Sequence, residues 1–240
     1  MPTFTRDDVV INYEVHGEGP PVLLFAPGGM RSAIAFWDRA PIHPIRELSA
    51  EFQVIALDQR NAGASRAPVL PTDGWPTYTA DHLALLDHLR IERCQALGMC
   101  IGSAFALSLA KAAPHRLTSA VLLQPIGFSG DNRATFHDLV NSWAADLMRT
   151  RPDVTPQAAA SLRDNMYSGD FVFAVSREDV KHCPLPLLVL RGNDVYHPSA
   201  ISEEVAALAP HAQLIREWKE GPAVQQAWAQ VKKFLASHRA

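Results

Sequence analysis

Two glycines flank a cysteine in the segment Gly98-Met99-Cys100-Ile101-Gly102. A short apolar run typical of a buried strand precedes it, and a stretch rich in alanine and leucine, which favours a helix, follows it. A sharp strand-to-helix turn needs glycines because strand and helix pass close together, and it holds the central side chain above the sheet. The segment therefore predicts a thiol, Cys100, held at the N-terminus of a helix.

A thiol in such a position is suited to nucleophilic attack. It ionises with a pKa of about 8.5 unaided, whereas a serine hydroxyl needs an adjacent base. The helix N-terminus favours the thiolate, but burial in an apolar pocket raises the pKa and makes the thiol inert. The sequence leaves both outcomes open, together with the alternative that Cys100 is simply a small buried hydrophobe.

The elements that must position this turn are visible as apolar patterns. An alternating run at residues 9–17 predicts a half-exposed edge strand. Continuous apolar runs predict strands covered on both faces at residues 22–27, 53–58, 93–98, 119–125 and 185–192. A last strand is expected at residues 212–218. Helical spacing predicts helices at residues 77–89, 101–114, 199–210 and 222–237. Alternating strands and helices indicate an α/β fold with a doubly wound, mostly parallel sheet.

One stretch breaks this alternation. No strong strand pattern occurs between residues 127 and 182, while apolar residues there recur at helical spacing. We interpret residues 127–182 as a small helical cap inserted into a core formed by residues 1–126 and 183–240. Ordinary crossover helices are the alternative.

The cysteine turn resembles the nucleophile elbow of the α/β-hydrolase superfamily, and the resemblance covers essentially the whole chain. Two further segments support it: residues 26–30, after the strand at 22–27, resemble the family's oxyanion-hole loop, and residues 58–65 resemble its D-x-R-G-x-G-x-S turn with Asn61 in place of one glycine. The resemblance implies that the amides of Ile101 and of the Gly28–Gly29 loop face a developing oxyanion. The alternative is that Gly28 and Gly29 merely permit a tight turn.

The family's triad acid follows the strand after the cap, which corresponds here to Asp194. Its histidine normally follows the last strand, but this chain has Lys219-Glu220-Gly221-Pro222 there. His197, three residues beyond Asp194, is the better candidate for a base or substrate ligand, and a loop histidine bonded to backbone is the alternative. His43 and His137 are the other two histidines whose positions allow an approach to the pocket.

These residues predict an enzyme: a hydrolase that acts on an ester, lactone or thioester through Cys100. Dienelactone hydrolases of the same superfamily use a Cys-His-Asp arrangement, which is similar at the turn but has its histidine in the usual place. Lyase or C–C bond chemistry, and ligand binding without turnover, remain alternatives. Aromatic residues predict a small, mainly apolar substrate, although they could equally pack the core: Phe36, Trp37, Phe128, Phe136 and Trp143.

The composition indicates which partners, compartment and cofactors to expect. A net charge of −3 gives no case for nucleic acid or an anionic membrane as partner, so a small molecule is expected. Three cysteines and no signal-peptide pattern favour a reducing compartment, and we expect a cytoplasmic protein. Neither metal-ligand spacing nor a dinucleotide fingerprint occurs, so no cofactor is expected. The sequence does not decide between a monomer and a homo-oligomer.

Overall fold

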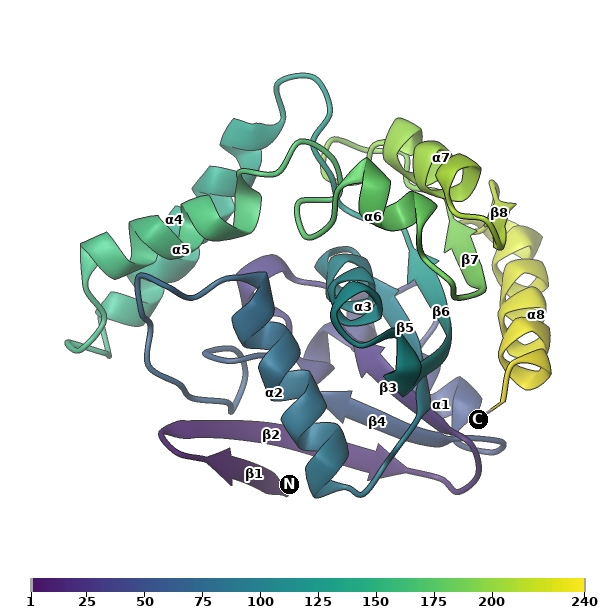
Figure 1. The fold of residues 1–240 in the computed structure, drawn as a ribbon, viewed down its shortest axis with the longest axis horizontal. Coiled ribbons are helices and arrows are strands. Elements are labelled where there is room, and N and C mark those ends of the chain that lie inside the picture. The colour runs from purple at the N-terminus through teal and green to yellow at the C-terminus, as the bar shows by residue number, and fades with distance from the viewer. Residues whose placement is uncertain (1, 240) are drawn as a thin grey trace.

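The computed structural model of the chain describes residues 2–239 and centres on one eight-stranded sheet (Figure 1). Its strand order is β1-β2-β4-β3-β5-β6-β7-β8. The strands are β1 Thr3–Arg6, β2 Val9–His16, β3 Pro21–Phe25, β4 Gln53–Leu57, β5 Cys94–Met99, β6 Leu117–Leu123, β7 Leu187–Leu190 and β8 Ala212–Ile215. β1 with β2 and β2 with β4 are antiparallel, and every other pair is parallel, which confirms the predicted fold class.

The burial of each strand explains whether its sequence pattern predicts it. β5 and β7 are buried along their whole length, as expected for strands that helices cover on both faces. β1, with the sequence TFTR, alternates between exposed and half-buried residues at the edge of the sheet, so it leaves no apolar run.

Helices cover both faces of the sheet (Figure 1). α1 (Pro44–Leu48) and α8 (Gly221–Ser237) contribute to one core cluster, whereas α2 (Trp75–His88), α3 (Ile101–Ala112) and α7 (Ser199–Leu208) contribute to the other. Three short 3₁₀ helices, η1 (Gly29–Arg31), η2 (Ile34–Arg39) and η3 (Pro114–Arg116), lie in the connections. The helices thus form the two outer layers of a doubly wound sheet.

Three helices lie between β6 and β7: α4 (Arg133–Met148), α5 (Pro156–Tyr167) and α6 (Arg177–Lys181). α4 and α5 pack side by side and project from the body of the molecule (green in Figure 1). Asn61 ties them to the core, because its carbonyl oxygen accepts a hydrogen bond from Trp143 Nε1 (3.2 Å) and its Oδ1 accepts one from Arg151 Nη1 (3.3 Å). The division into a cap at residues 127–182 and a core stays a prediction.

The register of the parallel strands brings their carboxyl ends to one edge. Phe25 of β3 pairs with Gly98, and Leu123 of β6 pairs with Met99 of β5 and with Leu190 of β7. The loops that follow β3, β5 and β7 therefore meet at this edge, where open α/β sheets hold their ligands.

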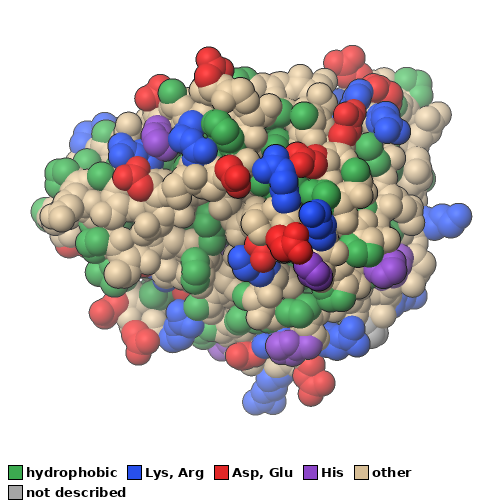
Figure 2. Space-filling view, turned by 45° about the horizontal axis from the view of Figure 1, so that its top comes forward, with side chains coloured by type: hydrophobic (Ala, Val, Ile, Leu, Met, Phe, Trp, Pro, Cys, Tyr) green, Lys and Arg blue, Asp and Glu red, His purple; other side chains and the backbone are tan. Residues whose placement is uncertain are grey.

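The surface carries charges of both signs. Figure 2 shows lysine and arginine side chains interspersed with aspartate and glutamate on the viewed face. Several of them form ion pairs, such as Arg177 with Glu204. Within residues 2–239 every helix is too short or too polar to cross a membrane.

Candidate active site

Cys100 occupies the turn between β5 and α3 with backbone angles φ 61° and ψ −122°. Positive φ is uncommon for residues other than glycine, so the surroundings must hold this conformation. The Cys100 amide donates a hydrogen bond to the Leu123 carbonyl (2.9 Å), and Ser103 Oγ donates one to the Gly98 carbonyl (2.8 Å). The half-buried thiol is thus fixed at the edge of the sheet where the carboxyl ends of the parallel strands meet.

The two glycines of the turn are required by close packing. A Cβ atom on Gly98 would lie 2.0 Å from the Gly102 carbonyl oxygen, and one on Gly102 would lie 2.0 Å from the Phe25 carbonyl oxygen. Both are backbone atoms that cannot move aside. β3, β5 and α3 therefore approach one another as closely as the sequence pattern predicts.

The loop after β3 brings one backbone amide, that of Gly28, to the thiol. Gly28 has φ 120° and Gly29 has φ 60°, both in the region that favours glycine. The N–H groups of Gly28 and Ile101 hydrogen-bond the Cys100 sulfur, whereas Gly29 begins the short helix η1. Phe36 packs over Gly28, since a Cβ atom there would lie 2.9 Å from its ring.

Asp194 and His197 lie in the loop between β7 and α7. His197 Nδ1 is 2.8 Å from Asp194 Oδ1 and 2.9 Å from Oδ2, and the His197 amide also donates to Oδ1 (3.0 Å). Gly192 allows this tight loop, because a Cβ atom there would lie 2.2 Å from the His197 carbonyl oxygen. The Asp194 side chain is 44% exposed, whereas that of His197 is only 11% exposed.

His197 also interacts with Cys100, so the structure brings the three predicted residues together. Its Nε2 is buried and has no hydrogen-bond partner of ordinary geometry among residues 2–239, and the Cys100 thiol is the ionisable group that it neighbours. Burial lowers the pKa of His197, but the Cys100 thiolate and the Asp194 carboxylate outweigh it and raise the pKa to about 9. The hydrogen bond from His197 in turn holds the pKa of Asp194 well below its usual range.

The pKa of Cys100 reflects the opposite balance. Burial raises this pKa, but the charge of His197, its hydrogen bond and the two amides together lower it below the ordinary value for a thiol. A thiolate and an imidazolium stabilise each other when they are neighbours in a low-dielectric site. The arrangement favours the ion pair, which is the reactive form of a cysteine nucleophile.

Lys219 is a member of this site that sequence reasoning missed. It follows β8, in the segment that lacks a histidine, and its Nζ lies 3.7 Å from Asp194 Oδ2 and 2.5 Å from Asn193 Oδ1. Burial lowers the pKa of Lys219. No sequence signal distinguishes this lysine from a surface lysine, because its contact with Asp194 depends on how the β7 and β8 loops meet.

The five aromatic residues that were predicted to contact the substrate lie in different parts of the structure. Phe36 lies beside Gly28, and Phe136 belongs to a cluster with Tyr167 (5.4 Å between ring centroids), Phe173 (4.8 Å) and Tyr196 (6.0 Å). Phe128 is covered by the Arg133 guanidinium at 4.2 Å. The ring of Tyr196 lies 6.2 Å from that of His197, so the Phe136 cluster extends to His197.

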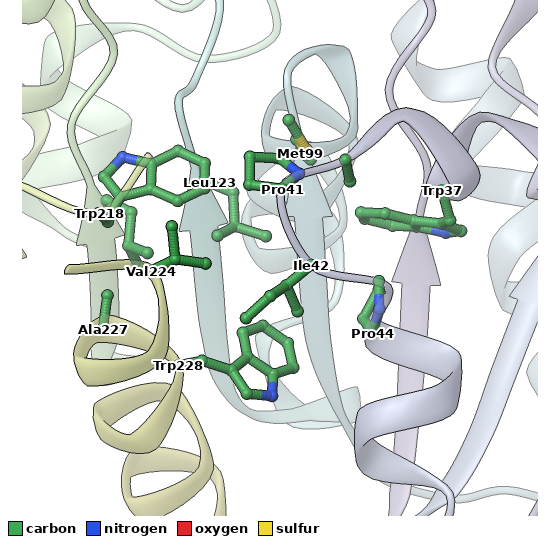
Figure 3. Close-up of a pocket in the computed structure, with 12 residues that line it drawn as sticks. Trp37, Pro41, Ile42, Pro44, Met99, Leu123, Trp218, Val224, Ala227 and Trp228 are labelled. Carbon is green, nitrogen blue, oxygen red and sulfur yellow. The ribbon is translucent and has the colours of Figure 1, made fainter. Parts of the chain in front are cut away.

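Two tryptophans have packing partners of their own. Trp143 is buried and bonded to Asn61, as described above. Trp37 is buried in the core cluster to which α1 and α8 contribute, where it lines a small apolar cavity with Trp218 and Trp228 (Figure 3). Substrate contact by the five predicted aromatic residues stays a prediction.

The other two candidate histidines have separate environments. His43 lies 3.4 Å from Asp38, and His137 lies in α4, where burial and the charge of Arg163 lower its pKa. His82, on α2, is fully buried and bonded to Gln59 (2.8 Å), and burial lowers its pKa to about 3. Across residues 2–239 no group of three or more His, Cys, Asp or Glu side chains is arranged to hold a metal ion.

Known proteins resemble this chain over different lengths. It is 32% identical to a provisionally named carbamate hydrolase of Azorhizobium caulinodans (51% of this chain, 44% of the relative) and 29% identical to 3-oxoadipate enol-lactonase 2 of Acinetobacter baylyi (55% and 48%). These alignments thus span about half the length of the curated relatives. The solved meta-cleavage product hydrolase of Pseudomonas fluorescens has a TM-score of 0.70 at 23% identity, covering 98% of this chain and 96% of its own.

The family model described as the alpha/beta hydrolase fold matches residues 21–222. That range extends from β3, through the cysteine turn and the Asp194 loop, to the first turn of α8. The chain therefore belongs to the alpha/beta hydrolase fold family.

Proposed function

We propose that this protein is a hydrolase that cleaves an ester, lactone or thioester of a small, mainly apolar substrate, with Cys100 as the nucleophile. The observation that supports the proposal is the position of His197, whose Nδ1 lies 2.8 Å from Asp194 Oδ1 while its ring neighbours the Cys100 thiol. A nucleophile, a base and a group that orients the base are the parts of a catalytic triad.

In the first step the Cys100 thiolate attacks the substrate carbonyl carbon. The carbonyl oxygen becomes an oxyanion, which accepts hydrogen bonds from the N–H groups of Gly28 and Ile101, with Gly29 shaping the loop. Loss of one such donor typically costs roughly 2.7–4 kcal/mol of transition-state stabilisation. The C–O or C–S bond then breaks, and His197 Nε2 gives its proton to the leaving group.

In the second step water hydrolyses the thioester formed on Cys100. Neutral His197 takes a proton from the water through Nε2, and the resulting hydroxide attacks the acyl carbon. The tetrahedral intermediate collapses and expels the Cys100 thiolate, while the imidazolium remains. The acid is released and the resting ion pair is restored, so the proton balance closes. Asp194 holds the imidazole orientation throughout.

The relatives agree with hydrolysis of small substrates, since they include a carbamate hydrolase and an enol-lactonase by name. The absence of a histidine after β8 is the feature that favours C–C bond chemistry, a lyase reaction or binding without turnover. Because His197 lies beside Cys100, it can supply the imidazole that is missing after β8. Hydrolysis through Cys100 is therefore the better supported function.

The test is acyl-enzyme trapping with para-nitrophenyl acetate, followed by mass spectrometry of the digested protein. We expect an acetyl group on Cys100, and loss of both adduct and turnover in Cys100→Ala. Cys183→Ala is the matched control, because Cys183 is a buried free thiol whose pKa burial raises, and it should keep full activity. Undiminished turnover in Cys100→Ala would overturn the proposal.

A further inference from the structure

One buried asparagine bonds the backbone of the turn at residues 194–197, which carries the acid and the base of the candidate triad. Asn132 is only 4% exposed and stands directly before α4, in the segment that follows β6. Its Nδ2 donates hydrogen bonds to the carbonyl oxygens of Val195 (2.9 Å) and Gly127 (2.9 Å). Its Oδ1 accepts a hydrogen bond from the Ser129 amide (3.0 Å). The segment after β6 is thus joined to the turn after β7 by one side chain.

The side-chain amide of Asn132 is fully used by these contacts. An asparagine amide has two N–H hydrogens and an oxygen acceptor, and all three groups have a partner here. Reversing the amide would place its oxygen against two carbonyl oxygens and its hydrogens against the N–H of Ser129. The three partners therefore admit one orientation, and an alanine would leave all of them without this side chain.

The turn that Asn132 bonds is stiff within itself. The His197 amide donates a hydrogen bond to the Asp194 carbonyl oxygen (3.1 Å), and the amides of Tyr196 and His197 each donate to Asp194 Oδ1 (3.0 Å). The Val195 side chain is 52% exposed, so it contributes little packing that could hold the turn in place. A bond to the Val195 carbonyl oxygen therefore positions the whole turn, including the imidazole of His197.

The other end of the segment is bonded to the cysteine turn. The Leu123 carbonyl oxygen, at the end of β6, accepts hydrogen bonds from the Cys100 amide (2.9 Å) and from Ser103 Oγ (3.1 Å). The chain then continues to Gly127, whose carbonyl oxygen is bonded by Asn132. The chain that leaves β6 consequently contacts both the turn that carries the thiol and the turn that carries the imidazole.

We infer that Asn132 is a positioning residue, whose amide holds the turn at residues 194–197 at the spacing from the cysteine turn that brings the imidazole of His197 next to the Cys100 sulfur. The inference rests on the proposed function, in which His197 serves Cys100, and adds to it a residue from the segment between β6 and β7. Because Asn132 also precedes α4, the position of the imidazole depends on how this segment enters α4.

The first test measures alkylation of Cys100 by iodoacetamide, followed by mass spectrometry, over a range of pH. In Asn132→Ala the imidazolium should lie less well beside the sulfur, so less of the thiol should be ionised. We expect the rate at about pH 7 to fall about threefold or more, and the pH of the half-maximal rate to rise by about half a unit. An unchanged rate and pH profile in Asn132→Ala would overturn the inference.

Asn165→Ala is the matched control, because Asn165 Nδ2 also donates to two carbonyl oxygens, those of Pro71 (3.0 Å) and Asp73 (2.8 Å). Both alanine variants lose two such bonds, so both should melt at a lower temperature than the natural protein. Only Asn132→Ala should change the alkylation of Cys100. Equal slowing in the two variants would mean that a general loss of stability, rather than the position of the turn, controls the thiol.

A double variant tests whether Asn132 acts through His197. In a His197→Ala background the further change Asn132→Ala should leave the alkylation rate unchanged, because the imidazole that Asn132 positions is gone. A further slowing of the same size as in the natural protein would contradict the inference. Asn132→Ser keeps a small polar side chain before α4 but can donate only one hydrogen bond. It should change alkylation in the same direction by less, and it decides the question if Asn132→Ala does not fold.

Turnover of para-nitrophenyl acetate gives a second readout. In Asn132→Ala we expect kcat to fall about tenfold with KM within about twofold of the natural value, because a displaced imidazole impairs the chemical steps more than binding. A rise in KM with kcat unchanged would overturn the positioning role. If the natural protein does not hydrolyse the ester, the proposed function fails, whereas the alkylation rates still decide whether Asn132 positions His197.

Discussion

Asp194 and His197 are three residues apart, and the 2.8 Å contact between them joins the acid and the base of the candidate triad within a single loop. The usual histidine position after the last strand is instead filled by Lys219, which approaches the other carboxylate oxygen. The thiol, the amides and this loop come from three strand ends at one edge of the sheet. This arrangement leads to predictions for each part.

Replacing His197 should deprive Cys100 of its counter-ion. In His197→Ala the pKa of the thiol should rise, because the charge and hydrogen bond that lower it are gone while the burial that raises it remains. Alkylation of Cys100 by iodoacetamide at about pH 7 should slow about tenfold or more. His182→Ala removes an exposed histidine and is the control. An unchanged alkylation rate would contradict the ion pair.

The pH dependence of turnover should follow the same pair. Formation of the acyl-enzyme needs the thiolate and a protonated His197, whose pKa is raised to about 9. The value of kcat/KM should therefore fall as pH rises through about 9, and fall again on the acid side where the thiolate takes up a proton. A profile that keeps rising beyond about pH 9 would show that His197 does not act as the acid.

Lys219 should lower the pKa of His197 indirectly, because its positive charge weakens the attraction between Asp194 and the imidazolium. Removal of its positive charge in Lys219→Met leaves the carboxylate more strongly basic toward the imidazolium, so the alkaline limb of the pH profile should move upward by a few tenths of a unit. The pair is partly exposed and 3.7 Å apart, and surface ion pairs contribute only about 0.2–1 kcal/mol, so the expected shift is small. Lys219→Arg should restore the original profile, and identical profiles for all three proteins would exclude the coupling.

The turn itself should not tolerate a side chain. Gly98→Ala would drive a Cβ atom to 2.0 Å from the Gly102 carbonyl oxygen, so the free energy of unfolding measured in urea should fall by more than about 3 kcal/mol. Gly130→Ala is a useful comparison, since a Cβ atom there meets nothing within 4 Å and only its φ of 61° opposes the change. We expect it to cost about 1–2 kcal/mol.

The apolar cavity between α8 and the segment around Ile42 offers a stabilising change (Figure 3). Val224→Ile adds one methyl group toward the space bordered by Trp218 and Leu123, and it should raise the free energy of unfolding by up to about 1 kcal/mol. Activity should be unaffected. Destabilisation would mean that the space is too narrow for the added group.

Much of the fold could be predicted because its signals are local. The continuous apolar runs of β3 to β7 and the alanine-rich sequence of α3 predict these elements directly. The glycines of the cysteine turn predict its close strand-to-helix packing. α2 begins at Trp75, two residues before the predicted start, with Thr77 Oγ1 accepting a hydrogen bond from the Gly74 amide. β1 is absent from the predicted strands because its edge sequence, TFTR, has Phe4 as its one apolar residue and so forms no apolar run.

The site was less accessible to sequence reasoning where distant segments meet. Cys100, Gly28 and the Asp194–His197 loop follow recognisable strands, so topology alone predicts their common edge. The contact of Lys219 with Asp194 depends instead on how the end of β8 packs against the loop after β7. A loop lysine gives no sequence pattern that reveals such a neighbour.

The position of Asp194 and His197 in one four-residue turn has a mechanical consequence. Their separation is set by short-range backbone geometry, so relative movement of the seventh and eighth strands does not pull them apart. The two groups instead shift together as a rigid unit with respect to the sulfur. Alignment of the three groups then depends on one variable distance, from the imidazole to the thiol. A histidine from a separate loop would add a second variable distance, from the imidazole to the carboxylate.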